Sequence, residues 1–370
     1  MKKSRRGLLK LTGIGVAGTE IWQPFTIIQG KTSKNNRAIV DSAVATLEDG
    51  SVISIPFWRV DSGKDGPSLL LIAAQHGNEV QGAEVARRFK EICANRIRAG
   101  SVWLIPMAEL RGIRIRRYTV ESQPDLRVQD KAFHRSWPGN PDGNDTERIA
   151  YTLDQAVVRH CSHAMDMHCW EHVNAAETLA EKDNESSRAL GDVTATRFIS
   201  YRNTSMPKSE NMSFSQLVLK RGASFTVMEL SGQYQMQERQ VLMGLSSMVN
   251  IAKLLGMIEG EPEQIKPRVV RTPETSHELH APDTGIFMPA LQRDKKRTLM
   301  PEDFVEEGQQ IGHIIRESDL VTVPVIAPVS GYMWLYGLCH WGLCDDNLPA
   351  QHPYTEEGEL IAVIVTEKTP

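Results

Sequence analysis

Two short polar motifs, each at the end of an apolar run, contain the side chains most able to bind a metal ion. The first is His-Gly-Asn-Glu, in which His76 and Glu79 follow the apolar run 68–74. An imidazole and a carboxylate are two of the three protein ligands that leave a zinc ion an open position for water. The two side chains can converge on one ion if the turn between them is tight, and Gly77 permits such a turn. The alternative is a polar helix start, where Glu79 interacts favourably with the helix dipole.

The second motif is Asp-Met-His at the end of the next apolar run. Side chains alternate along a strand, so Asp166 and His168 should point to the same side. His168 is therefore the predicted third ligand, and Asp166 is a carboxylate able to support a ligating imidazole. A structural Cys/His zinc knot is the competing interpretation, but its spacing matches no standard pattern; its members would be His160, Cys161, His163, Cys169 and His172.

A third carboxylate, Glu229, ends the apolar run 224–230. A carboxylate in that position is costly unless it is solvated, paired or functional. As a general base it would take a proton from a water molecule activated by the metal. A solvated strand end is the alternative.

Two arginines are candidates for the same pocket. Arg135 lies in the aromatic loop 133–139, and Arg117 lies in a basic segment upstream of it. A guanidinium group can bind a carboxylate through two hydrogen bonds, and a cation can stabilise an oxyanion. Either arginine could instead be an ordinary surface charge.

The elements that must position these residues alternate between strands and helices. Apolar runs predict strands over 38–46 and 52–60, separated by a turn at Glu48–Gly50. The run 68–74 predicts a strand buried on both faces, the spacing over 79–97 predicts a helix, and 101–107 predicts another strand. A strand, a helix and a strand in this order indicate a parallel βαβ unit.

Further along, helices are predicted over 145–161 and 238–255, and strands over 164–168 and 224–230. The sequence thus predicts an α/β domain over 37–258 that contains the candidate zinc site, with a mixed or parallel sheet flanked by helices. A Glu-, Pro-, Lys- and Arg-rich linker over 259–276 follows. A small all-β domain over 277–370 is predicted from short strands at 285–289, 310–315, 321–326, 331–336 and 360–365.

Composition narrows the range of partners. The net charge of −4, with no basic stripe beyond the N-terminus, gives no reason to expect nucleic acid. No segment after the first 20 residues approaches a membrane span in length. Five cysteines are too few and too scattered for a disulfide scaffold, although Cys339 and Cys344 are close enough in sequence to pair. The sequence does not predict whether they do so, nor the oligomeric state.

The N-terminal segment 1–30 has the pattern of an export signal and a tether. Ser4–Lys10 resembles the twin-arginine signal, with Leu8 where that motif usually has Phe, and a short apolar stretch follows. This predicts export to the periplasm. The alternative is a basic, frayed N-terminus on a cytoplasmic protein.

These motifs together resemble the succinylglutamate desuccinylase and aspartoacylase family, a branch of the carboxypeptidase-like zinc hydrolases. The resemblance spans roughly residues 66–365, about four-fifths of the chain. About 90 residues separate the first motif from Asp-Met-His, which also suits this family. The residues that carry the resemblance are His76–Glu79, Ile105–Ala108, Arg117-Tyr118, Arg135 to Gly139, Asp166–His168 and Glu229.

The resemblance implies one zinc ion per chain, held by His76, Glu79 and His168. It implies that Glu229 is the base, that Arg117 polarises the substrate carbonyl and that Arg135 binds a substrate carboxylate. The expected reaction is therefore hydrolysis of an amide in a small molecule that also bears a carboxylate, as in deacylation of an N-acyl amino acid.

The chain departs from the family pattern in three places. His134 stands where the family usually has Asn, and Glu109-Leu110 stands where it has Asn-Pro. The further substrate-binding arginine of aspartoacylases has no clear match, although Lys220 and Arg221 lie nearby. The resemblance therefore leaves the acyl group and the amine open.

Two other functions stay open from the sequence. A metallocarboxypeptidase or a cell-wall peptide amidase would share the metal site, and a non-catalytic binding protein could keep the zinc.

The C-terminal domain also resembles biotinyl and lipoyl carrier folds, and the segment 327–331 fits them. Because the carrier motif Met-Lys-Met is absent, no attached cofactor is predicted.

Overall fold

The computed structural model describes residues 38–120, 132–206, 211–292, 295–338 and 352–367. The predicted export signal and tether, and Cys339 and Cys344, lie outside these residues. Within the described ranges, none of the helices combines the length and the apolar character needed to cross a lipid bilayer.

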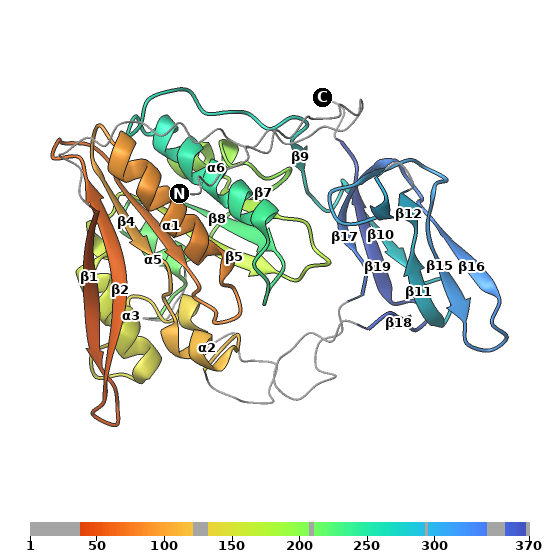
Figure 1. Cartoon of the computed structure of the whole chain (residues 1–370), viewed down its shortest axis with the longest axis horizontal. Coiled ribbons are helices and arrows are strands. Elements are labelled where there is room, and N and C mark those ends of the chain that lie inside the picture. Colours follow the sequence, from red (N-terminus) through yellow and green to blue (C-terminus); the bar gives the residue numbers. More distant parts are fainter. Residues whose placement is uncertain (1–37, 121–131, 207–210, 293–294, 339–351, 368–370) are drawn as a thin grey trace, which may run out of the picture. The chain divides into compact units, whose positions relative to one another are not determined.

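A nine-stranded sheet forms the centre of the first part of the chain, with the strand order β1-β2-β4-β3-β5-β8-β6-β7-β9 (Figure 1). The central strands β4, β3, β5 and β8 are mutually parallel, whereas β1, β2 and the β6–β8 pair introduce antiparallel neighbours. The sheet is therefore mixed and mostly parallel. Its strands are β1 (Ala38–Thr46), β2 (Val52–Asp61), β3 (Ser68–Ala73), β4 (Ser101–Ile105), β5 (His163–Trp170), β6 (Glu177–Glu181), β7 (Phe198–Arg202), β8 (Ser224–Ser231) and β9 (Val269–Val270).

Helices cover both faces of this sheet. On one face, α1 (Gln81–Arg96) and α6 (Glu238–Leu254) pack together over Leu69 and Leu71; on the other, α3 (Asp145–Ala156) and α5 (Phe214–Lys220) cover Leu70 and Ile72. Each of these β3 side chains is fully buried, which contributes about 2 kcal/mol per residue. The continuous apolar run is thus explained by burial on both faces.

The β3–α1–β4 unit is parallel, as the sequence predicts. Helix α1 begins at Gln81, after Glu79, and has no side-chain cap. The helix predicted over 145–161 is shorter than expected. Asn144 and Glu147 form a capping box at its start, but α3 ends at Ala156 and a separate 3-10 turn follows at Val158–His160.

Two short helices, α2 (Leu110–Ile115) and α4 (Glu185–Asp192), complete this part of the fold. The predicted linker 259–276 contains β9, which pairs with β7 in the large sheet. The domain limits themselves stay a prediction.

The C-terminal part consists of antiparallel strands. Four-stranded sheets with the orders β10-β19-β17-β14 and β16-β15-β11-β18 enclose a core that includes Phe287, Ile311, Ile314, Met333 and Ile364. The prediction of a mixed, mostly parallel sheet with helices, followed by a small β unit, is confirmed. The strands are β10 (Ser276–His280), β11 (Gly285–Pro289), β12 (Leu291–Gln292), β13 (Arg297–Thr298), β14 (Phe304–Val305), β15 (Gln310–Arg316), β16 (Thr322–Ile326), β17 (Gly331–Tyr336), β18 (Tyr354–Thr355) and β19 (Leu360–Val365).

Candidate metal and catalytic site

His76, Glu79 and His168 converge in the interior of the protein. Their potential ligand atoms all lie within 4.8 Å of one another, and all three residues are buried. The Nδ1 atoms of His76 and His168 each lie 2.8 Å from a different oxygen of Glu79. Among the described residues, no other group of three such side chains converges in this way, so the alternative Cys/His knot does not form there.

The topology explains why residues far apart in the sequence meet here. His76 follows the carboxyl end of β3, and His168 lies near the carboxyl end of the adjacent parallel strand β5. Parallel α/β sheets generally place their sites at this edge. The N–H of Glu79 donates to the carbonyl oxygen of His76 at 3.2 Å, so the turn between these two ligands is tight, as expected.

Gly77 is required in this turn because of a close backbone approach. A Cβ atom at Gly77 would lie 2.0 Å from the carbonyl carbon of Gly112 and 2.3 Å from its oxygen. Gly77 is not among the described glycines with positive φ, so space, rather than a left-handed conformation, makes glycine necessary.

We expect Gly77→Ala to lower the free energy of unfolding by about 2–3 kcal/mol and to weaken metal binding, because the backbone at the turn must move. Gly222→Ala is the matched control. A Cβ there meets nothing within 4 Å, and only its φ of +74° is unfavourable, at about 1 kcal/mol. Denaturant unfolding and a zinc-binding measurement test both variants. An effect of Gly77→Ala no larger than that of the control would contradict the steric explanation.

Electrostatics keep Glu79 ionised. Burial alone would raise its pKa, but the charges and hydrogen bonds of His76 and His168 outweigh burial and lower the pKa to about 2. Burial also acts against the charge on His168, yet Asp166 and Glu79 raise its pKa well above the usual value. Burial lowers the pKa of His76. A carboxylate between two imidazoles is a donor set that suits zinc, which requires deprotonated ligands.

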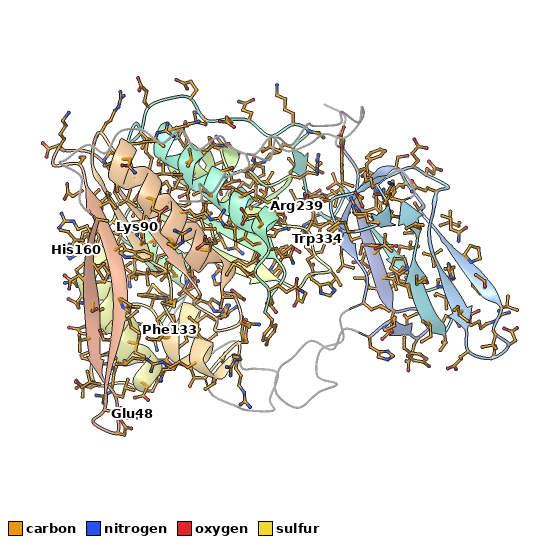
Figure 2. The ribbon with its side chains drawn as sticks, viewed as in Figure 1. Glu48, Lys90, Phe133, His160, Arg239 and Trp334 are labelled. Carbon is orange, nitrogen blue, oxygen red and sulfur yellow. The ribbon has the colours of Figure 1, made fainter. Side chains whose placement is uncertain are left out.

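A chain of hydrogen bonds supports His168 from behind. Asp166 Oδ1 lies 3.1 Å from His168 Nε2 and accepts from Gln75 Nε2 at 2.7 Å. Gln75 Oε1 in turn accepts from the buried indole N–H of Trp137 at 2.8 Å. Asp166 therefore contacts the ligand that its sequence position predicts it to support. Gln75 was not predicted, although it directly precedes His76. Phe133, which is labelled in Figure 2, packs edge-on against Trp137. The ring centroids are 5.5 Å apart.

His134 supports the other imidazole. Its Nδ1 lies 2.8 Å from Nε2 of His76, and its Nε2 accepts a hydrogen bond from Nε of Arg135 at 3.1 Å. Burial lowers the pKa of His134 well below its usual value, and the neighbouring cations act in the same direction. The residue that departs from the family pattern thus lies between a metal-site histidine and the predicted carboxylate binder.

Glu229 lies beside the cluster. It pairs with His168 in the register of β5 and β8, and its Oε2 atom has no hydrogen-bond partner among the described residues. Burial is the main reason that its pKa is raised to about 8, and the carboxylates of Glu79 and Asp166 add to the increase. A proton-accepting group without a protein partner is suited to act on a bound water or substrate.

The cluster opens into a cleft of about 620 Å³. Arg135 and Glu229 line it, together with His76 and His168. Arg202, at the end of β7, also lines the cleft and was missed, because nothing in the local sequence distinguishes it from a surface charge.

Two further arginines named in the sequence analysis, Arg117 and Arg221, are not among the residues that line the cleft. The predicted role of Arg117 is therefore left untested. Its neighbour Tyr118 does line the cleft and stacks on His76, with ring centroids 3.8 Å apart. Arg221 forms an ion pair with Asp154.

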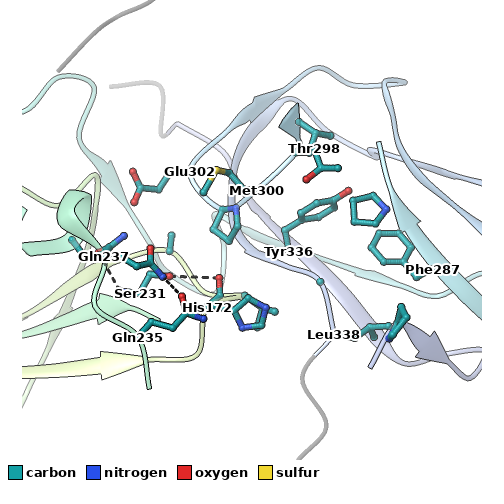
Figure 3. A pocket seen from close by; sticks show the side chains of 18 of the residues that line it. His172, Ser231, Gln235, Gln237, Phe287, Thr298, Met300, Glu302, Tyr336 and Leu338 are labelled. Atoms are coloured by element: carbon teal, nitrogen blue, oxygen red, sulfur yellow. Dashed lines mark hydrogen bonds between the residues drawn. The ribbon is translucent and has the colours of Figure 1, made fainter. Parts of the chain in front are cut away.

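The loop after β8 connects the site to a second cavity, of about 430 Å³ (Figure 3). Ser231, Gln235 and Gln237 line this cavity with His172, and Ser231 Oγ donates to the carbonyl oxygen of His172 at 3.5 Å. Gln233 of the same loop donates to Glu79 at 3.4 Å and to the carbonyl oxygen of Cys169 at 2.8 Å. None of the residues predicted to bind the metal (His76, Glu79, His168), to catalyse (Glu229, Arg117) or to bind the substrate (Arg135) lines the second cavity.

Comparison with known proteins agrees with this geometry. Residues 65–255, just over half of the chain, match the profile of the succinylglutamate desuccinylase/aspartoacylase catalytic domain. The chain belongs to the succinylglutamate desuccinylase/aspartoacylase family. The family assignment made from the sequence is therefore confirmed, and with it a family of metal-dependent deacylases.

Individual relatives within this family are distant. An N-alpha-acetyl-L-2,4-diaminobutyric acid deacetylase from Halomonas elongata is 24% identical over 71% of this chain and 74% of its own. A succinylglutamate desuccinylase/aspartoacylase from Rhodobacter sphaeroides has a TM-score of 0.62 at 19% identity, over 90% of this chain and 96% of that one. The product-bound ectoine utilization protein EutE (DoeB) from Ruegeria pomeroyi has a TM-score of 0.62 at 16% identity, over 91% and 98% of the two chains. At these identities the two structures support the fold alone.

Proposed function

We propose that the chain is a zinc-dependent amide hydrolase that removes the acyl group from an N-acyl amino acid or a related small molecule. The observation that carries this proposal is that the buried cluster of His76, Glu79 and His168 opens, through the two histidines, into the cleft that Glu229 and Arg135 line. The Halomonas relative, named as a deacetylase of an N-acetylated amino acid, supports the same class of reaction.

His76, Glu79 and His168 would hold the zinc ion. When bound, zinc supplies Lewis-acid polarisation of the carbonyl and lowers the pKa of water. The three protein ligands leave a coordination position for water or substrate, as in other catalytic zinc sites. Asp166 and His134 would orient the two imidazoles through the hydrogen bonds described above.

Glu229 would move the proton. One of its carboxylate oxygens accepts a proton from the attacking water, while the water oxygen bonds to the amide carbon. The same carboxyl group then gives the proton to the amide nitrogen as the carbon–nitrogen bond breaks, so that a carboxylate and a free amine leave. The unpartnered Oε2 atom and the raised pKa of Glu229 in the metal-free protein suit both the acceptance and the return of a proton.

Two guanidinium groups would bind and orient the substrate. Arg135 and Arg202 both line the cleft, and a guanidinium can bind a carboxylate through two parallel hydrogen bonds. A substrate that carries at least one carboxylate next to the amide is therefore favoured.

Release of free amine from a panel of N-acyl amino acids and short peptides tests this function directly. The zinc-loaded protein should release amine from N-acyl amino acids and much less from the matching amides that lack the carboxylate. Cleavage of peptides alone would favour the peptidase instead. Zinc binding with no hydrolysis across the panel would contradict the proposed deacylase.

Removing the charge of Arg135 should mainly affect substrate binding. We expect Arg135→Ala to raise KM by about 10- to 100-fold for a carboxylate-bearing substrate, the usual worth of a hydrogen bond to a charged group. The ratio of kcat/KM between that substrate and its neutral amide should fall accordingly. Arg98→Ala is the control, since Arg98 pairs with Glu259 and does not line the cleft. Equal effects on both substrates would argue against carboxylate binding by Arg135.

A further inference from the structure

His134 connects the metal site to the predicted carboxylate binder through two hydrogen bonds. On one side its Nδ1 lies 2.8 Å from Nε2 of His76, and on the other its Nε2 lies 3.1 Å from Nε of Arg135. The rings of His76 and His134 meet edge to face, with centroids 4.7 Å apart. A histidine with a partner on both nitrogens must match its single proton to what those partners require.

The partners fix the tautomer of His134 in the metal-free protein. A guanidinium group can only donate, so Nε2 of His134 must carry a lone pair. The proton of His134 therefore sits on Nδ1 and is donated to Nε2 of His76. His76 then carries its own proton on Nδ1, which it donates to Glu79 at 2.8 Å. The three hydrogen bonds thus form a chain in which Arg135 donates to His134, His134 donates to His76 and His76 donates to Glu79.

A metal ion at the cluster requires the hydrogen bond between His76 and His134 to reverse, so that His76 becomes the donor. His76 and His168 both present Nδ1 to Glu79, so these are the nitrogens that face the ion. When His76 gives its Nδ1 lone pair to a metal, its proton moves to Nε2. Nε2 then donates to Nδ1 of His134, whose proton must sit on Nε2. Two donors, His134 Nε2–H and Arg135 Nε–H, would now face each other, and the hydrogen bond between them is lost.

We propose that His134 is a positioning residue that couples the two halves of the site, so that metal binding at His76 releases Arg135 from His134 for a substrate carboxylate. Without a metal, Arg135 Nε donates to His134; with a metal, this hydrogen bond is broken and the N–H can instead donate to a substrate carboxylate. The inference rests on the metal site and on the role of Arg135 proposed above. Because coupling between two sites is reciprocal, a carboxylate bound to Arg135 also favours metal binding.

A double-mutant cycle on zinc affinity measures this coupling. Arg135→Ala removes the hydrogen bond that zinc binding must break and also removes a positive charge. In the His134→Ala background only the charge effect is left, so the gain in zinc affinity should be about tenfold smaller there, the usual worth of such a bond. Arg202→Ala is the matched control: it removes a cleft cation whose side chain has no hydrogen bond to His134 among the described residues, and it should act equally in both backgrounds. Equal gains for Arg135→Ala in both backgrounds would contradict the coupling.

The tautomers can also be observed directly in the wild-type chain. Long-range ¹H–¹⁵N correlation spectra of protein labelled with ¹⁵N-histidine report which ring nitrogen carries the proton, and the loss of one signal set in His134→Asn assigns His134. We expect the proton on Nδ1 in the zinc-free protein and on Nε2 after zinc is added. The same tautomer in both states, with zinc bound and amide hydrolysis intact, would overturn this inference alone. A wild-type protein that binds no zinc would overturn the proposed function as well.

Discussion

Replacing Glu229 with Gln is expected to lower kcat by about 10³-fold or more while the protein still binds one zinc ion. General acid–base catalysis by one side chain contributes about 10²–10⁴-fold, and Glu229 is proposed both to accept and to return the proton. The amide of Gln keeps the shape of the side chain but cannot accept the proton of water. Steady-state amine release and the zinc content of the same sample are the measurements.

The control for this variant is Glu171→Gln. Glu171 is another half-buried carboxylate near the end of β5, and burial raises its pKa as well, but it does not line the cleft. It should retain nearly the full turnover of the wild type. Turnover of Glu229→Gln within a factor of a few of the wild type would remove Glu229 from the mechanism.

Replacing Glu79 with Gln is expected to abolish zinc binding at micromolar concentrations and, with it, the stabilisation that zinc gives. A ligand present at 1,000 times its Kd stabilises the native state by about 4 kcal/mol, which amounts to several degrees in Tm. Each carboxylate oxygen of Glu79 is hydrogen-bonded to one of the two histidines, His76 or His168. The neutral amide of Gln has only one oxygen and no charge, so it cannot accept both hydrogen bonds or balance the charge of the metal. Thermal unfolding with and without zinc shows the difference.

Glu84→Gln is the matched control for Glu79→Gln. Glu84 lies in the first turn of α1, only five residues further along, and forms ion pairs with Arg87 and Arg88 at the surface. Zinc should raise the Tm of this variant as much as that of the wild type. If zinc stabilised Glu79→Gln to the same extent, the metal would have to bind elsewhere.

The parts of this site that the sequence predicts are those encoded by neighbouring residues. Leu69–Ala73 is apolar at every position because its side chains enter cores on both faces of the sheet, and such a strand must end where a polar motif begins. His76 and Glu79 follow it, and the alternation through Asp166 to His168 gives the third ligand the right side of its strand. The convergence of His76, Glu79 and His168 could therefore be predicted from periodicity and spacing.

The residues that line the rest of the cleft could not be predicted from periodicity and spacing in the same way. β6 and β7 are only five residues long, and α4 and α5 have eight and seven residues, so each is too short to show a clear period. Arg202 lines the cleft from the end of β7, a strand that runs parallel to β6 and therefore antiparallel to β8. Tertiary packing, rather than local sequence, decides which polar side chains face the metal site.

The contact between His134 and His76 also could not be predicted from the sequence. The two residues are 58 positions apart. The sequence shows that His134 departs from the family pattern, but it does not show that His134 contacts His76. Only the structure shows that His134 has a partner on each ring nitrogen. Arg117, whose role is implied by the family pattern, is not among the residues that line the cleft, and that role stays a prediction.

The most direct test of the central claim is a titration of zinc into chelator-treated wild-type protein while amine release from an N-acyl amino acid is followed. We expect no turnover without metal, a linear increase up to one equivalent of zinc per chain and no further increase beyond it. Turnover in the metal-free protein, or an increase that continues to two equivalents, would contradict a single catalytic metal held by His76, Glu79 and His168.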